Sequence, residues 1–124
     1  MAGTIVADDL QHSTAGSVGT EYVVNGSAKA WVNLTGTGTI SINDSFNVSS
    51  ISDQATGKYR ITQSNAMSSA SYSYGAGHVK SGDNSPHAGY NGSLTTTQWQ
   101  LESTNFGSYI DADRATGQSF GDLA

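Results

Sequence analysis

The chain of 124 residues contains no cysteine, a single proline and only five Lys and Arg residues. Without cysteine, a disulfide-stapled scaffold, a thiol nucleophile and a thiolate zinc site are excluded. The net charge of −5 argues against a nucleic-acid partner, because such binders cluster cations against phosphates. No stretch approaches the roughly 20 apolar residues of a membrane span, so we expect no membrane insertion. Asp8 and Asp9 interrupt the start of the chain, and no secretory signal is expected there.

Small polar residues dominate what is present. Ser, Thr, Asn and Gly make up 55 of the 124 residues, and hydrophobic residues only 35%. Disordered chains share this low hydrophobicity, but they are usually rich in Pro, Glu and Lys and poor in aromatics. Here six Tyr, three Phe and two Trp accompany the single Pro. The composition therefore favours one folded domain of short strands joined by many tight turns.

Alternation of apolar and polar residues predicts strands along most of the chain, and no convincing helix is found. In the segment 28–34, Ala30, Val32 and Leu34 share one face, while Trp31 lies on the other. Similar alternation predicts further strands over residues 39–43, 45–51 (with a bulge at Ser49-Ser50), 58–62, 70–79, 94–101, 106–110 and 118–123.

The turn residues agree with an antiparallel arrangement. Asn25-Gly26 and Asn91-Gly92 are dipeptides that favour type I′ hairpin turns, and Gly57 suits a left-handed position before a returning strand. Short strands with closely spaced turns are typical of sandwiches and small barrels. We therefore predict an all-β fold, an antiparallel, jelly-roll-like β-sandwich of about eight to ten short strands.

The beginning of the chain differs from the rest. We predict an N-terminal arm over residues 1–19 and a single β-sandwich domain over residues 20–124, because one short apolar strip is followed by polar, Gly-containing sequence. We expect Ile5 and Val6 to lodge against a neighbouring chain, with the two aspartates that follow at the rim. A domain this small gains from added interface burial, so a homotrimer is the expected state.

No residue pattern predicts an enzyme. His12, His78 and His87 are too scattered for a local metal motif, and no serine lies in a G-x-S-x-G elbow. Asp111 and Asp113 have a spacing that suits a hard cation, or they form a solvated acidic turn. We therefore predict no catalytic residues, no cofactor and no metal site.

Exposed aromatic residues are the better candidates for a binding surface. Tyr72 and Tyr74 are expected on one strand face, and Tyr90 lies beside a turn. Such rings either form a protein or sugar interface or fill the core with their hydroxyl groups at its rim. Trp31 opposes Val32 across its strand, so one of the two faces the core and the other a second contact surface.

Several segments together form a recognisable pattern. These are Asn25–Asn33, Gly36–Gly38, Asp44–Ile51, Asp53, Thr56–Tyr59, Asn65–Met67, Tyr72 and Phe120–Leu123. The pattern resembles a module of virion structural proteins in tailed bacteriophages, often marine or cyanobacterial ones, frequently labelled tail-fibre-like. Lys-Ala-Trp-Val-Asn and Phe-Asn-Val-Ser-Ser are its most specific parts. Leu34 stands where an aromatic residue is common, and Lys58 where an acidic residue is common.

The resemblance implies a non-enzymatic virion component, on the outer capsid or on the tail. A receptor-binding fibre needs a shaft and an attachment domain, and this short chain beginning with Met contains neither. The expected role is therefore a capsid decoration (cement) protein that binds the phage major capsid protein and stabilises subunit contacts. The alternatives are the receptor-binding tip of a tail fibre, with other tail proteins or a host-surface glycan as partner, and a carbohydrate-binding β-module.

Overall fold

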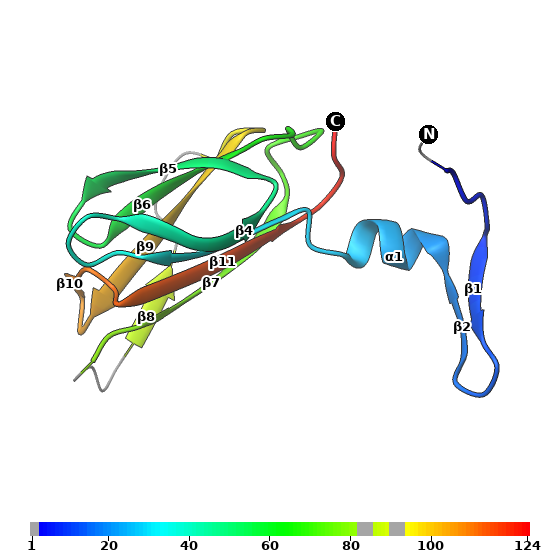
Figure 1. Cartoon of the computed structure of the whole chain (residues 1–124), viewed down its shortest axis with the longest axis horizontal. Helices are drawn as coiled ribbons and strands as arrows, with labels where there is room; N and C mark the ends of the chain where they lie inside the picture. Colours follow the sequence, from blue (N-terminus) through cyan, green and yellow to red (C-terminus); the bar gives the residue numbers. More distant parts are fainter. Residues whose placement is uncertain (1–2, 82–85, 90–93) are drawn as a thin grey trace.

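The computed structural model describes residues 3–81, 86–89 and 94–124. Strands hold 55% of this structure and helix 6%, and every strand pair is antiparallel. The prediction of an antiparallel all-β fold is therefore confirmed. Two larger sheets make up a body, and a smaller hairpin projects from it at the N-terminal end (Figure 1).

The body consists of a four-stranded and a five-stranded sheet. The four-stranded sheet has the order β4-β3-β11-β7, formed by β3 (Ala30–Thr35), β4 (Ser41–Phe46), β7 (Ser73–Val79) and β11 (Arg114–Phe120). The five-stranded sheet has the order β10-β9-β6-β5, with β8 also paired to β9. Its strands are β5 (Val48–Ala55), β6 (Lys58–Gln63), β8 (Pro86–Gly89), β9 (Gln98–Asn105) and β10 (Ser108–Tyr109).

Both sheets contribute to one shared core. In β3, Val32 and Leu34 point inward and are buried, whereas Trp31 is 36% exposed on the outer face. The alternation predicted for this strand is therefore confirmed, as is the assignment of Trp31 and Val32 to opposite faces. The buried cluster consists of Val32, Leu34, Tyr59, Ile61, Met67, Tyr72, Trp99, Leu101, Ala112 and Ala115.

Strand β9 begins later than the sequence predicted. The alternation suggested a strand from residue 94 to 101, but β9 runs from Gln98 to Asn105. The Thr95 side chain explains the shift, because its Oγ1 accepts hydrogen bonds from the backbone N–H groups of Thr97 (3.3 Å) and Gln98 (2.9 Å). This local turn competes with the ladder and delays the strand.

Asn47 separates β4 from β5, where the sequence predicted one strand over residues 45–51. Its backbone has φ 53°, a left-handed conformation that asparagine tolerates better than most residues. Its side-chain amide donates to the carbonyl of Lys29 (3.0 Å), and its Oδ1 accepts from the backbone N–H of Asn65 (2.8 Å). The predicted bulge is present as well, as a register shift between Val48 and Ser50.

The helix α1 (Thr20–Gly26) corrects the prediction that the chain has no helix. It has seven residues, none of them buried, so it lacks the long amphipathic period that reveals a helix in a sequence. Asn25-Gly26 forms its last turn, and the prediction of a hairpin turn there is wrong. Asn91-Gly92 lies outside the described residues. The division of the chain at residue 19 stays a prediction.

Gly117 of β11 lies directly beneath the indole ring of Trp99 from the opposite sheet. A Cβ atom at Gly117 would come within 2.5 Å of the ring, and within 2.9 Å of Leu101. Because cores repack poorly around added atoms, we expect Gly117→Ala to lower the free energy of unfolding by about 1–3 kcal/mol in urea denaturation.

Gly77 of β7 provides the matched control. Among the described residues, a Cβ atom there would meet only Thr116 Oγ1, at 3.4 Å. Gly77→Ala should leave stability unchanged or raise it by up to about 1 kcal/mol, because alanine restricts the unfolded chain. Equal effects of the two substitutions would contradict the close packing of the sheets at Gly117.

Candidate interaction surface

The N-terminal extension, defined as residues 3–26, lies outside both sheets of the body. Its hairpin pairs β1 (Asp9–His12) with β2 (Gly16–Gly19), and α1 follows directly. Thr20 joins the hairpin to the helix, because its N–H donates to the carbonyl of Asp8 (2.8 Å) and its hydroxyl to that of Ala7 (2.7 Å). Figure 1 shows the extension reaching away from the two sheets.

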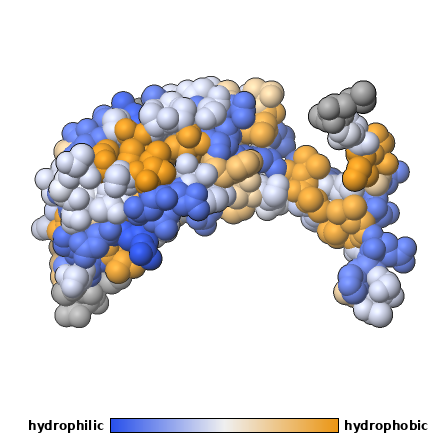
Figure 2. Space-filling model, in the orientation of Figure 1, coloured by the Kyte–Doolittle hydropathy of each residue, from blue (hydrophilic) through white to orange (hydrophobic). Residues whose placement is uncertain are grey.

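Large apolar side chains of the extension face solvent. Ile5 and Val6 are 90% and 92% exposed, and Tyr22 is 69% exposed. Leu10, Val18, Val23 and Val24 are also exposed. Figure 2 shows apolar residues gathering along the extension. Contiguous apolar surface of this kind marks a contact site in soluble proteins, unlike single scattered residues.

Five of these side chains, Ile5, Val6, Leu10, Val23 and Val24, line two adjoining hollows that share Val23 and Val24, here called the extension groove. The first hollow has about 400 Å³ and is lined by Ile5, Val6, Ala7, Leu10, Thr20, Val23 and Val24. The second has about 580 Å³ and reaches the body through Ser27, Lys29, Asp122 and Leu123. The groove therefore runs from the predicted apolar strip to the residues that follow β11.

Lys29 connects the extension to the body. Its Nζ donates to the carbonyl of Val24 at the end of α1 and to Ser27 Oγ (3.0 Å). Its backbone N–H donates to the carbonyl of Ser119 in β11 (2.8 Å). A cation at the C-terminus of a helix also interacts favourably with the helix dipole. The side chain thus fixes the direction in which α1 leaves the body.

A second exposed apolar feature lies on the outer face of the four-stranded sheet. Trp31 of β3 is directly opposite Phe46 of β4, which is 55% exposed. Gln118 of β11 is the partner of Trp31 on its other side. Two aromatic rings on neighbouring strands with an amide beside them form a small flat platform, which the sequence predicted at Trp31 alone.

The tyrosines predicted for an interface lie elsewhere. Tyr72 is buried in the core, and its hydroxyl donates to the carbonyl of Gln98 (3.0 Å), which agrees with the second of the two roles that the sequence left open. Tyr74 is half-buried and is the register partner of the fully buried Ser119, so it shares the inward-facing side of β7. Tyr90 lies outside the described residues.

A polar cluster on the outer face of the five-stranded sheet surrounds the buried Glu102. Its carboxylate accepts from Gln100 Nε2 (3.0 Å) and the Tyr109 hydroxyl (3.2 Å), and it pairs with Lys58 Nζ (3.4 Å). The hydrogen bond with Tyr109 is the main cause that raises the pKa of Lys58, and the Glu102 carboxylate adds to it. Buried charges need such partners, so this cluster explains how β9 tolerates Glu102.

The two aspartates whose spacing suited either a cation or an acidic turn make separate contacts. Asp111 Oδ1 accepts the backbone N–H of Gly57 (2.7 Å). Asp113 accepts from the N–H of Ser81 (2.7 Å) and pairs with Lys80 (3.3 Å). The bond from Ser81, followed by Lys80, lowers the pKa of Asp113. Both carboxylates therefore fasten neighbouring loops to the sheets.

The three histidines of the chain lie on three different strands. His12 Nδ1 accepts the N–H groups of Thr14 (3.2 Å) and Ala15 (3.1 Å) in the hairpin turn. His78 lies in β7, and His87 lies in β8. Residues 3–81, 86–89 and 94–124 hold no group of three His, Asp or Glu side chains that suits a metal ion. None of the helices described there is long and apolar enough to cross a membrane.

No protein-family model, curated protein or solved structure matches the chain.

Tyr59 predicts a specific loss of stability at high pH. Burial is the main cause that raises the pKa of its hydroxyl to about 12, and the Asp111 charge adds to it. The unfolded chain has a tyrosine pKa near 10, so Tyr59 favours folding below about pH 10, and this contribution is lost between about pH 10 and 12. Tyr59→Phe should therefore be less stable than wild type at about pH 8, because the N–H of Ala112 loses its acceptor.

The difference between wild type and Tyr59→Phe should shrink as the pH rises from about 10 to 11. Urea denaturation at a series of pH values measures it. Tyr22→Phe, at an exposed position, shows the effect of the same change without burial. A difference between wild type and Tyr59→Phe that stays constant with pH would contradict the burial of the Tyr59 hydroxyl.

The two tryptophans provide a matched pair. We expect Trp99→Ala to lower the free energy of unfolding by about 3–5 kcal/mol, because the ring fills the core. Trp31→Ala should cost about 1 kcal/mol or less and should weaken assembly if the platform is a contact surface. Urea denaturation and light scattering measure the two effects. Similar destabilisation by Trp99→Ala and Trp31→Ala would show that Trp31 is a core residue. If Trp31→Ala changes neither stability nor assembly, Trp31 is neither a core residue nor a contact residue.

Proposed function

We propose that this chain is a non-enzymatic structural protein that attaches to a larger assembly through its N-terminal extension. The carrying observation is the exposed apolar surface of the extension, with Ile5 and Val6 almost fully in solvent. An extension with no buried residue in α1 gains little stability by itself. Burial of its apolar side chains against a partner supplies the missing stabilisation.

The assembly we propose is the outer capsid of a tailed bacteriophage, where the chain is a decoration (cement) protein bound to the major capsid protein. The resemblance of the segments around Trp31 and Phe46 to virion modules motivates this choice. A projecting extension on a self-contained body suits a protein that adds to a preformed surface, because the body needs no rearrangement on binding. The proposal includes no catalytic residue and no cofactor.

We further propose a jelly-roll-like sandwich that assembles as a homotrimer. The last strand, β11, lies between β3 and β7, so strands from the two ends of the body are neighbours. β4 and β5 lie at sheet edges, and most of their residues are exposed. Exposed edges are covered in natural proteins by a neighbour or by self-pairing. In the proposed trimer, one of these edges pairs with a neighbouring copy of the chain.

The Trp31–Phe46 platform favours a second candidate function. Exposed aromatic rings beside an amide are suited to a sugar ring or a protein surface. A receptor-binding tip of a tail fibre, or a carbohydrate-binding module, would use this face of the four-stranded sheet. In that case Trp31→Ala abolishes binding to the glycan, and deletion of the extension does not.

Deletion of residues 2–19 tests the proposed attachment. The deletion leaves every strand of the body in place, so its free energy of unfolding should change by less than about 1 kcal/mol. Binding to capsids that lack the chain should be lost, as measured by co-sedimentation. Gln11→Ala in the exposed hairpin is the control and should bind like wild type.

Labelled electron microscopy of virions then places the chain on the particle. Label on the head supports the decoration role, and label on the tail supports the fibre alternative. If the deletion binds capsids as well as the full chain, the extension is a passive tail and the proposal is wrong.

A further inference from the structure

We infer that the partner seated in the extension groove is a protein surface with an apolar centre and a rim of Lys and Arg side chains. The inference rests on the proposed function, in which the extension is the attachment segment. It adds the chemistry of the partner, which the charges around the groove supply.

The extension carries charge of one sign only. Residues 3–28 contain Asp8, Asp9 and Glu21, and no Lys or Arg. The first cation of the chain is Lys29, and its Nζ is already hydrogen-bonded to the carbonyl of Val24 and to Ser27. The extension therefore carries three carboxylates and no Lys or Arg side chain from the same segment.

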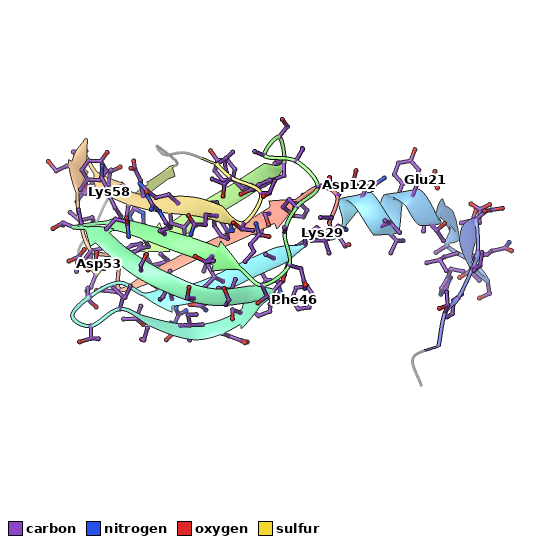
Figure 3. The ribbon with its side chains drawn as sticks, turned by 90° about the horizontal axis from the view of Figure 1, so that it is seen from above. Glu21, Lys29, Phe46, Asp53, Lys58 and Asp122 are labelled. Atoms are coloured by element: carbon purple, nitrogen blue, oxygen red, sulfur yellow. The ribbon has the colours of Figure 1, made fainter. Side chains whose placement is uncertain are left out.

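Two of these carboxylates, Asp8 and Glu21, directly follow a residue that lines the first hollow. Asp8 follows Ala7, which lines the first hollow. The Asp8 carbonyl accepts a hydrogen bond from the N–H of Thr20, which lines the same hollow. Glu21 follows Thr20, and its side chain lies against Gly19. At the far end, the exposed Asp122 itself lines the second hollow. Figure 3 shows Glu21 on α1 and Asp122 where the helix meets the body.

The negative charge of the residues beside the groove distinguishes between possible occupants. A second copy of the extension would bring the same three carboxylates together, and like charges in an interface cost free energy. An anionic lipid surface or a nucleic acid is disfavoured for the same reason. A partner with cations around an apolar centre pairs with the rim and covers Ile5, Val6 and Val24 at once.

Two fluorescent peptides of about 15 residues probe the groove directly in the full-length protein. Both are amphipathic helices with the same leucine face, and the polar face is lysine in one and glutamate in the other. By fluorescence anisotropy at about 50 mM NaCl, we expect the lysine peptide to bind at least about tenfold more tightly than the glutamate peptide. The ratio should shrink at about 500 mM NaCl, where charges are screened.

Charge-neutral variants separate local from overall charge. Asp8→Asn with Glu21→Gln should reduce the preference for the lysine peptide several-fold. Asp44→Asn with Asp53→Asn removes the same number of negative charges from the body and should leave the preference for the lysine peptide unchanged. Asp53 lies at the end of the body remote from Glu21 (Figure 3). Val23→Ser with Val24→Ser should weaken binding of both peptides.

The outcomes distinguish this inference from the proposed function. If both peptides bind equally and depend on the two valines, the groove is a docking site but its partner is not basic, and the inference is overturned. If the two double charge variants act alike, overall charge explains the preference, and the inference is overturned as well. If neither peptide binds the wild-type chain, both the inference and the attachment through the groove are wrong.

Discussion

The contact of the Trp99 ring with Gly117 sets the distance at which the two sheets face each other. The chain buries few large side chains, so each ring must be packed closely to stabilise the fold. A glycine, which has no side chain, lies opposite each of two large rings and allows this close packing. Gly117 lies under Trp99, and Gly36 lies against Tyr59, whose hydroxyl accepts the N–H of Ala112. Small and large residues thus alternate across the core, and the polar loops are arranged around these contacts.

Hydrogen bonding in the loops explains why the sequence is so rich in small polar residues. Asn47 bridges two segments of the chain, Asp111 holds the turn at Gly57, and Thr95 ends one loop before β9. Each supplies hydrogen bonds to backbone groups that the sheets leave unpaired. A composition that resembles disorder in its low hydrophobicity therefore provides the connections of a folded β-domain.

Local alternation predicted the strands well where one face is buried, as in β3 and β6, because period two is the direct consequence of a half-buried strand. It missed α1, which buries no residue and so leaves no period to detect. It left open whether Tyr72 lies in the core or at an interface, because alternation alone does not show which face of a strand the core covers. The extension groove was foreseen only at Ile5 and Val6. The run Tyr22-Val23-Val24, in a segment without Lys or Arg, was the available signal for the rest.

The body and the extension therefore differ in what stabilises them: the body has a shared core, and the extension has exposed apolar side chains. Hydrogen–deuterium exchange of the free protein and of the same protein in its assembly tests this division most directly. The account predicts that amides of residues 3–26 exchange fast in the free protein and become protected on assembly, while those of β6 and β9 are protected in both. Equal exchange of residues 3–26 in the two states would contradict it.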